Sequence, residues 1–236
     1  MIPLHDATPT RRVPIVTRAL LAVNIILWLS VLSLSRTPGA AEAFYNKYSF
    51  DLSALVAAVG GTWSIETLFA FVPLLAHMFL HGGWLHLLGN MLYLWIFGDN
   101  VEDTLGSLPF LGFYIACGVV AAIGQGLIAA GPLVGASGAI AGVLGAYLLI
   151  SPTARISTLV FLGIFISIVQ LPAIIVIGMF VVLQVIEGVA ELRLGVHPAT
   201  QQIAYFAHVF GFLAGMLLLL FMRRGTSSRR MRTGWG

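Results

Sequence analysis

Charged residues and cysteines are scarce in this sequence. Asp, Glu, Lys and Arg make up 9% of its 236 residues, whereas about a quarter of a typical soluble domain is charged. This scarcity excludes an ordinary soluble domain. Cys117 is the single cysteine, which excludes an internal disulfide bond and any metal site made of several thiolates. We expect its thiol to pack in an apolar interior.

Hydrophobic residues take the place of the missing charges. They form 59% of the chain, and the mean hydropathy is +0.98. These values indicate a multi-pass membrane protein, and the hydrophobic runs predict an all-α fold, a six-helix transmembrane bundle. A further apolar segment, residues 158–169, is expected to be an interfacial or re-entrant piece. The six predicted spans are residues 19–35, 84–97, 110–130, 137–150, 173–189 and 203–222.

The basic residues predict the orientation of the chain. Nine of the 12 Lys and Arg residues fall in the two terminal tails or between spans four and five. Because cytoplasmic segments carry the excess of basic residues, we expect a plasma (inner) membrane protein with both termini in the cytoplasm. Residues 1–17 are predicted to be a disordered polar tail, 18–222 the membrane domain, and 223–236 a basic tail suited to anionic lipid of the bilayer. The net charge of +3 therefore requires no nucleic-acid partner.

Two connections outside the spans also allow predictions. Residues 36–76 are apolar and aromatic without forming a span, so we expect short helices partly in the outer leaflet, acting as a lid or as an anchor. Residues 98–106 contain three acids. We expect these acids to cap and brace a turn between spans two and three.

A serine between glycines begins a predicted span that is too short to cross a bilayer. From Ser137 to Ser151, where Pro152 blocks the helix, there are about 14 residues, or roughly 21 Å against a hydrocarbon core of about 30 Å. Ser137 is therefore expected about 10 Å below the outer surface. His208 lies about 14 residues before the end of the last span, so it is expected at the same level, provided that the two helices run in opposite directions. A hydroxyl and an imidazole at one depth suggest a nucleophile and its base.

Three histidines near the start of span two admit two interpretations. No glutamate lies between His77 and His81, and His81 and His86 are separated by about 140° around a helix, which disfavours chelation of a metal ion. His86 and Asn90 share one helix face, and His86 reaches the expected depth of Ser137. Polar side chains inside a membrane are costly unless they pair or face water. This face therefore either lines a wet cavity or holds helices together.

Small residues accompany both predicted reactive groups. Gly138 shares a face of span four with two further glycines, and Gly211 and Gly215 share a face of span six with His208, so each helix can approach a neighbour closely. Span six carries no acid to orient His208, so we expect a two-member Ser–His unit in which packing or water takes the third role. Glu187 in span five lies near the outer end, where we expect a structural or solvated role.

Three segments, in this order and spacing, resemble the rhomboid family of intramembrane serine proteases. Their sequences are HGGWLHLLGN (81–90), GASG (135–138) and AHVFGFLAG (207–215). Glu102 with Gly106 also resembles the family's turn after span two.

The resemblance implies a rhomboid-like fold that cleaves transmembrane helices of other proteins without metal or cofactor. It implies that Ser137 is the nucleophile and His208 the general base. His86 and Asn90 would serve the oxyanion hole. The residues for which it implies structural support are His81, Gly135, Gly138, Gly211 and Gly215.

Two positions depart from the family's pattern. Leu68-Phe69-Ala70-Phe71 stands where a Trp-Arg pair is frequent, and Ala141 stands where many members carry an aromatic residue that stacks on the base. Tyr205 or Phe212 is the expected replacement for that aromatic residue. The sequence carries no signal for an oligomeric state.

Two other functions fit parts of the pattern. A non-catalytic rhomboid-like protein that binds or escorts membrane helices would lack one member of the Ser–His pair, and both members are present. A transporter that uses His208 and Glu187 as proton carriers would show inverted repeats with broken helices. No segment in the first half of the chain matches the short helix that begins at Ser137.

Overall fold

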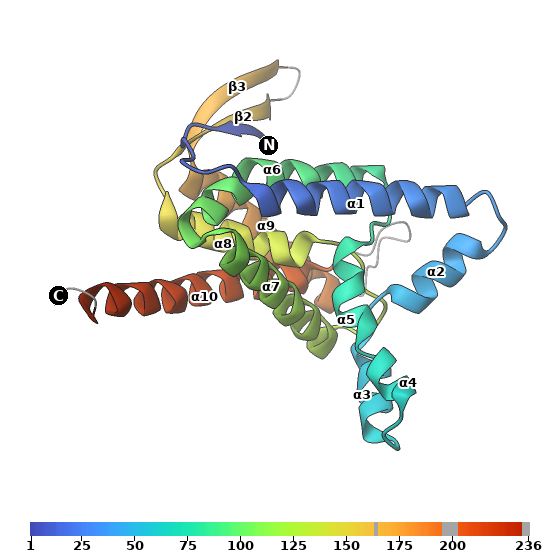
Figure 1. The fold of residues 1–236 in the computed structure, drawn as a ribbon. Helices are drawn as coiled ribbons and strands as arrows, with labels where there is room; N and C mark the ends of the chain where they lie inside the picture. Colours follow the sequence, from blue (N-terminus) through green and yellow to red (C-terminus); the bar gives the residue numbers. More distant parts are fainter. Residues whose placement is uncertain (163–164, 195–202, 233–236) are drawn as a thin grey trace.

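The computed structural model describes residues 1–162, 165–194 and 203–232, which form a helical bundle with one small sheet (Figure 1). Its six longest helices are α1 (Ile15–Leu34), α6 (Trp84–Leu105), α7 (Ser107–Ile128), α8 (Ser137–Ile150), α9 (Ala173–Leu194) and α10 (Tyr205–Arg232).

Several of these helices are suited to a bilayer. Within the described residues, four helices, α1, α7, α9 and α10, are long and apolar enough to cross a membrane. Helix α6 makes a fifth span if it is joined to the segment before it, from which it is bent by 80°, while α8 has only 14 residues. The chain is therefore a multi-pass membrane protein of mainly helical fold. The count of six spans stays a prediction.

Helix α8 lies at the centre of the bundle, in contact with α6, α7 and α10 (Figure 1). Every residue from Gly138 to Tyr147 is buried, because the helix is small and apolar on all its faces. Cys117 of α7 is fully buried against it, as predicted. A Cβ atom added to Gly142 would lie 2.5 Å from the Cys117 sulfur. The short serine helix is thus held by close packing on several sides.

Helices α8 and α10 run in the same direction, so the predicted opposite direction is wrong. A Cβ atom added to Gly211 would lie 2.0 Å from the carbonyl oxygen of Gly138, and one added to Gly215 would lie 1.9 Å from that of Gly142. The residue numbers of the contacting pairs increase in the same direction along α8 and α10, so the two helices are parallel. The two residues predicted to react, Ser137 and His208, still share one level, because each lies near the start of its helix and both helices start on the same side.

A three-stranded antiparallel sheet lies at one end of the bundle. It has the order β1 (Ile2–Asp6), β2 (Arg155–Leu162) and β3 (Phe165–Pro172). Residues 158–162 and 165–169 therefore lie in two paired strands, so the predicted re-entrant piece is wrong; their β-branched residues favour strands. The prediction of disorder for residues 1–17 is wrong for residues 2–6, which pair with β2. Buried Asp6 also accepts hydrogen bonds from Asn100 Nδ2 (3.0 Å) and the Tyr147 hydroxyl (2.7 Å).

The acidic segment after position 97 is helical and not a turn, because α6 continues to Leu105. Buried Glu102 accepts hydrogen bonds from the backbone N–H groups of Val16 (3.0 Å) and Thr17 (2.7 Å) at the start of α1. It also accepts one from the Ser107 hydroxyl (2.6 Å) at the start of α7. The predicted bracing role is thus confirmed for Glu102, and it extends to α1, whose first N–H groups have no partner within their own helix.

The connection of residues 36–76 forms short helices, as predicted. It pairs with the loop before α8, because Phe50 and Leu133 exchange two backbone hydrogen bonds (3.0 and 2.7 Å). The connection is thereby tied to the segment that leads to Ser137. Its helices are α2 (Ala40–Tyr48), α3 (Leu52–Gly60), α4 (Ile65–Phe69), α5 (Val72–Ala76) and the 3₁₀ turn η1 (His77–Phe79).

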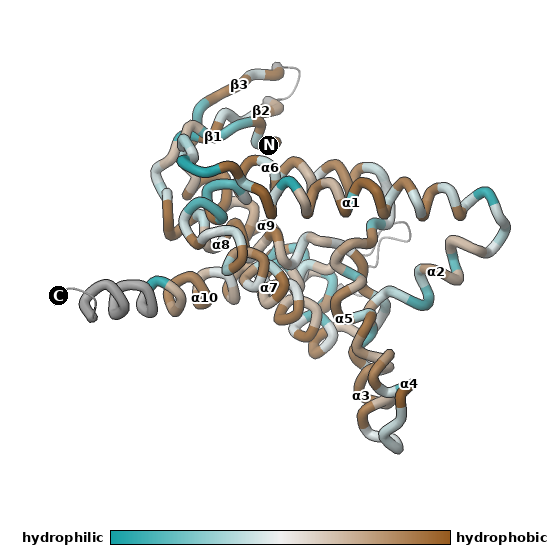
Figure 2. Tube along the Cα trace, viewed as in Figure 1, coloured by the Kyte–Doolittle hydropathy of each residue, from teal (hydrophilic) through white to brown (hydrophobic). Residues whose placement is uncertain are grey.

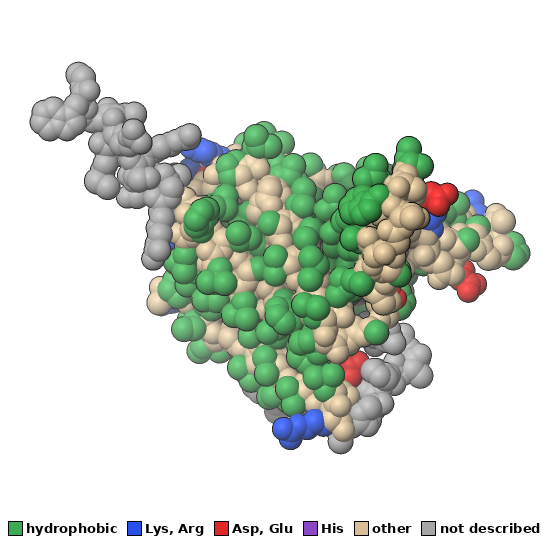
Figure 3. All heavy atoms as spheres, turned by 90° about the horizontal axis from the view of Figure 1, so that it is seen from below, with side chains coloured by type: hydrophobic (Ala, Val, Ile, Leu, Met, Phe, Trp, Pro, Cys, Tyr) green, Lys and Arg blue, Asp and Glu red, His purple; other side chains and the backbone are tan. Residues whose placement is uncertain are grey.

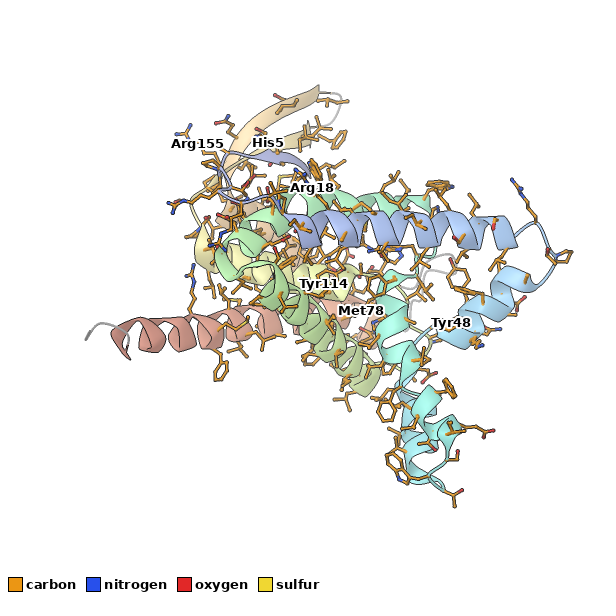
Figure 4. All side chains as sticks on the ribbon, in the orientation of Figure 1. His5, Arg18, Tyr48, Met78, Tyr114 and Arg155 are labelled. Carbon is orange, nitrogen blue, oxygen red and sulfur yellow. The ribbon has the colours of Figure 1, made fainter. Side chains whose placement is uncertain are left out.

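The surface of the bundle suits a lipid environment. Hydrophobic residues (brown) run along the outer helices in Figure 2, and hydrophobic side chains cover most of the face seen in Figure 3. Figure 4 shows Arg18 and Arg155 at the end where α1 begins and Tyr48 toward the opposite end. This separation agrees with the distribution of basic residues on which the predicted orientation rests.

Candidate active site

The serine loop takes a conformation that requires glycine. Gly135 has a φ of 126°, in a region that side chains rarely enter. Its N–H donates a hydrogen bond to the carbonyl of His77 (2.9 Å). A Cβ atom added there would lie 2.6 Å from His86 Nε2 and 3.6 Å from Ser137 Oγ. The imidazole of His86 thus lies directly against the loop that presents the serine.

One cavity of about 580 Å³ brings the four predicted reactive residues together. Ser137 enters it from the first position of α8, His208 from the first turns of α10, and His86 and Asn90 from α6. The depths estimated from helix rise therefore correspond to a common cavity. The roles of the four residues in a reaction stay predictions.

His208 is held by α9, which sequence reasoning did not predict. Its Nδ1 lies 2.6 Å from Gln184 Oε1, and its ring lies 5.9 Å from that of Phe180, at an interplanar angle of 38°. The aromatic residue in contact with His208 is thus Phe180. The prediction of Tyr205 or Phe212 for this contact is wrong. The third position next to the Ser–His pair is occupied by an amide, and not by packing or water alone.

This hydrogen bond favours one tautomer of His208. With the amide oxygen of Gln184 as the acceptor, Nδ1 carries the proton. The other ring nitrogen, Nε2, then has a free lone pair, which is the state that a general base needs. The signal in the sequence was weak: Phe180 and Gln184 are four residues apart on one face of an apolar helix.

The two polar residues of α6 have different surroundings. The rings of His86 and His81 meet edge to face, with centroids 5.2 Å apart. His81 is buried, and its carbonyl accepts a hydrogen bond from the Tyr45 hydroxyl (2.5 Å), a position that suits the predicted supporting role. Asn90 is also buried, and its Nδ2 has no hydrogen-bond partner within the described part of the chain.

A second glutamine also lines the cavity. Gln125 of α7 accepts a hydrogen bond from the backbone N–H of Ala207 (3.0 Å), the residue before His208. The first N–H groups of a helix lack partners within it. Gln125 therefore caps the first turn of α10, next to His208. Sequence reasoning missed Gln125. The glycines predicted as supports lie in the same region, since Gly138 packs against Ala207 and Gly211.

The described residues contain no group of three His, Cys, Asp or Glu side chains placed to hold a metal ion. His77, the first histidine of the cluster, is buried, and its Nδ1 lies 3.0 Å from the carbonyl oxygen of Pro73. His197 falls outside the described residues. The polar side chains that line the cavity are thus the hydroxyls of Ser137 and Tyr93, two imidazoles, three amides and the carboxylate of Glu191.

As a class, this is a multi-pass helical membrane protein with a serine and a histidine in one cavity. Residues 68–225 match the family model described as the Rhomboid domain. The match covers more than half of the chain, and the chain belongs to the rhomboid family.

Relatives of known name agree with this assignment. Rhomboid protease GluP of Bacillus subtilis (strain 168) is 38% identical over 109 residues, which are 41% of this chain and 22% of that protein. YdcA of the same organism is 33% identical over 142 residues, 58% of this chain and 63% of its own length. The mitochondrial presenilin-associated rhomboid-like protein of Homo sapiens is 35% identical over 98 residues, 39% of this chain and 26% of that protein. The chain thus spans less than two thirds of each of these relatives.

Proposed function

We propose that this protein is an intramembrane serine endopeptidase that cleaves transmembrane helices of other membrane proteins. The observation that carries the proposal is the shared cavity of Ser137, His208, His86 and Asn90. The hydrogen bond between His208 Nδ1 and Gln184 Oε1 supports it, because it leaves Nε2 of His208 to accept a proton. A serine hydroxyl becomes an effective nucleophile when such a base takes its proton.

The reaction follows from these positions. Ser137 Oγ attacks the carbonyl carbon of the scissile peptide bond, and its proton passes to Nε2 of His208. The protonated imidazole then gives this proton to the leaving amine, and an acyl-enzyme remains. Water, activated by the same nitrogen, hydrolyses the ester and restores the serine.

Charge on the carbonyl oxygen needs donors that are already in place. Asn90 Nδ2 is a buried donor without a partner among the described residues, and a buried unpaired donor is costly unless a ligand uses it. His86 and the backbone N–H of Ser137 lie nearby, and the start of α8 contributes its positive dipole end. These groups support the role of oxyanion hole for His86 and Asn90.

The proposed substrate is a transmembrane segment with small residues near the cut and residues that weaken its helix. A peptide bond within a helix is shielded until its hydrogen bonds open, so such residues make the bond accessible. The proposed location is a plasma membrane, with both termini in the cytoplasm, as the basic residues of the tails favour. We propose 18–222 as the membrane domain.

Replacement of Ser137 by alanine tests the proposal. We expect Ser137→Ala to remove cleavage of a panel of single-span reporter proteins by purified protein, with products mapped by mass spectrometry, and to remove labelling by a fluorophosphonate. Ser151→Ala, a change of the same kind at the other end of α8, is the control and should leave both signals intact. Cleavage that persists in Ser137→Ala contradicts the proposal. A parent protein that neither cleaves nor is labelled favours a helix-binding protein instead.

A further inference from the structure

We infer that Gln184 is the positioning residue for His208 and that it takes the place usually filled by a carboxylate beside a catalytic histidine. The inference rests on the proposed function, which it deepens. Its first observation is the 2.6 Å hydrogen bond between His208 Nδ1 and Gln184 Oε1. In serine hydrolases with three-member sites, the third member orients the imidazole and selects its tautomer.

Gln184 acts through His208 and from a different helix. The imidazole has two neutral tautomers, and only the one with the proton on Nδ1 leaves Nε2 able to accept the serine proton. Because Oε1 of Gln184 accepts the Nδ1 proton, the hydrogen bond favours this tautomer and restrains rotation of the ring. Gln184 is neutral, so it achieves this without a buried carboxylate, which a membrane interior disfavours.

Phe180 supports the same ring from the preceding turn of α9. Phe180 and Gln184 are four residues apart and therefore share a face. The Phe180 ring contacts His208 at a centroid distance of 5.9 Å, and both side chains line the cavity. Helix α9 thus supplies an aromatic contact and a hydrogen bond, while Ala141 of α8 offers only a methyl group.

Because α9 lies at the outside of the bundle, Gln184 can be replaced without disturbing the helix that carries Ser137. In the most apolar 18-residue stretch of α9, only 22% is buried inside the protein, against 44% in that of α10. Its side chains that do not face the cavity include the exposed Val182 and Ile186. A change at Gln184 therefore alters the environment of His208 without entering the tightly packed contact between α8 and α10.

Replacement of Gln184 by leucine and by glutamate tests the inference. Leucine removes the acceptor at similar size, and we expect kcat for a reporter helix to fall at least about tenfold with KM little changed. Glutamate keeps an oxygen acceptor, and we expect it to restore most of kcat. Gln170→Leu is the matched control, since Gln170 lies on β3, exposed and outside the cavity. A Gln184→Leu variant as active as this control, or a glutamate variant as inactive as leucine, overturns the inference.

A spectroscopic measurement separates this inference from the proposed reaction. Nitrogen-15 NMR of histidine-labelled protein distinguishes the two neutral tautomers, and His208→Phe identifies the His208 signal. In a Ser137→Ala background, we expect Nδ1 to be protonated with Gln184 and the tautomers to mix in Gln184→Leu. An unchanged His208 spectrum refutes the positioning role even if Ser137 proves essential for cleavage. Cleavage that does not need Ser137 refutes the proposed function and leaves the tautomer measurement valid.

Discussion

At the scale of single residues, the site depends on a glycine that has no chemical role of its own. Gly135 combines a φ of 126° with a contact to His86 so close that a Cβ atom would lie 2.6 Å from its Nε2. Two independent constraints, on backbone conformation and on space, therefore exclude any larger residue. The glycine lets the loop bring Ser137 and His86 together.

Replacement of Gly135 by alanine should accordingly reduce activity. A side chain at a positive φ costs about 1–2 kcal/mol, and the added methyl group must displace His86. Misplacement by about 1 Å can cost roughly 100-fold in rate, so we expect reporter cleavage to fall by at least about tenfold.

Gly39→Ala is the matched control for Gly135→Ala. Gly39 has a φ of 75°, yet an added Cβ atom would meet nothing within 4 Å. Its substitution should therefore show the conformational cost in thermal unfolding and leave cleavage unchanged. Equal cleavage by the two variants would argue against a role for the contact with His86.

Site residues that stand in a recognisable local sequence pattern could be predicted from the sequence. Residues whose role depends on a partner far away in the chain could not. Ser137 and His208 were placed at one depth from helix rise, and both line one cavity. Gln184 lies in an apolar helix among many residues that face outward, and nothing local shows that its amide reaches another helix. Its hydrogen bond depends on how α9 and α10 pack.

At the scale of the elements, the parallel contact between α8 and α10 positions the two proposed reactive groups. The backbones meet at glycines, with Gly211 against Gly138 and Gly215 against Gly142. Small residues permit such approach inside a membrane. Ser137 precedes the first of these contacts on α8, and His208 lies three residues before Gly211, so both side chains lie just beyond the point of closest approach.

Replacement of Gly211 by alanine should separate the two helices. The added methyl carbon would lie 2.0 Å from the Gly138 carbonyl oxygen, which is possible only if the backbones move apart. Overpacking of this kind costs about 1–3 kcal/mol, and we expect cleavage to fall by about 100-fold because the Ser–His distance grows. The measurements are thermal unfolding in detergent and reporter cleavage.

Gly112→Ala in α7 provides the matched control for Gly211→Ala. An added Cβ atom at Gly112 meets nothing within 4 Å. Alanine is the better helix former by about 1 kcal/mol, so stability should be equal or higher and cleavage unchanged. A Gly211→Ala variant that behaves like Gly112→Ala would show that the helices do not need this approach.

Helix ends and the hairpin show where local patterns mislead. The hydrophobic run of span two stops near residue 97, yet α6 continues to Leu105, because Glu102 on that last part is satisfied by groups from α1 and α7. Segment 158–169 is apolar and rich in β-branched residues, a composition that fits a strand as well as an interfacial piece. The pairing of β2 with β3, and of residues 156–159 with the amino-terminal strand, decides in favour of strands.

At the scale of the whole molecule, two buried acids connect segments that are far apart in the sequence. Glu102 joins α1, α6 and α7, and Asp6 joins the amino-terminal strand to α6 and α8. Both lie at the end of the bundle opposite the cavity, where α1 and α7 begin and α6 and α8 end. They therefore stabilise the bundle without taking part in the chemistry.

Replacement of Glu102 by alanine should destabilise the protein strongly. The substitution leaves the N–H groups of Val16 and Thr17 and two hydroxyl groups without their acceptor. We expect the free energy of unfolding to fall by about 2–4 kcal/mol, measured by thermal unfolding in detergent. Cleavage per folded molecule at low temperature should change little. Glu42→Ala, at an exposed position of α2, is the control and should change neither quantity.

The sequence alone determined that the chain crosses a membrane repeatedly, and it predicted a serine and a histidine at one level, because hydropathy, helix rise and helix-breaking residues act locally. The tertiary structure decided the parallel direction of α8 and α10, the sheet, and the amide and ring that hold His208. These features depend on contacts between segments that are distant in the chain. Such contacts arise from the packing of these segments against each other, which produces no recognisable sequence pattern within any one of them.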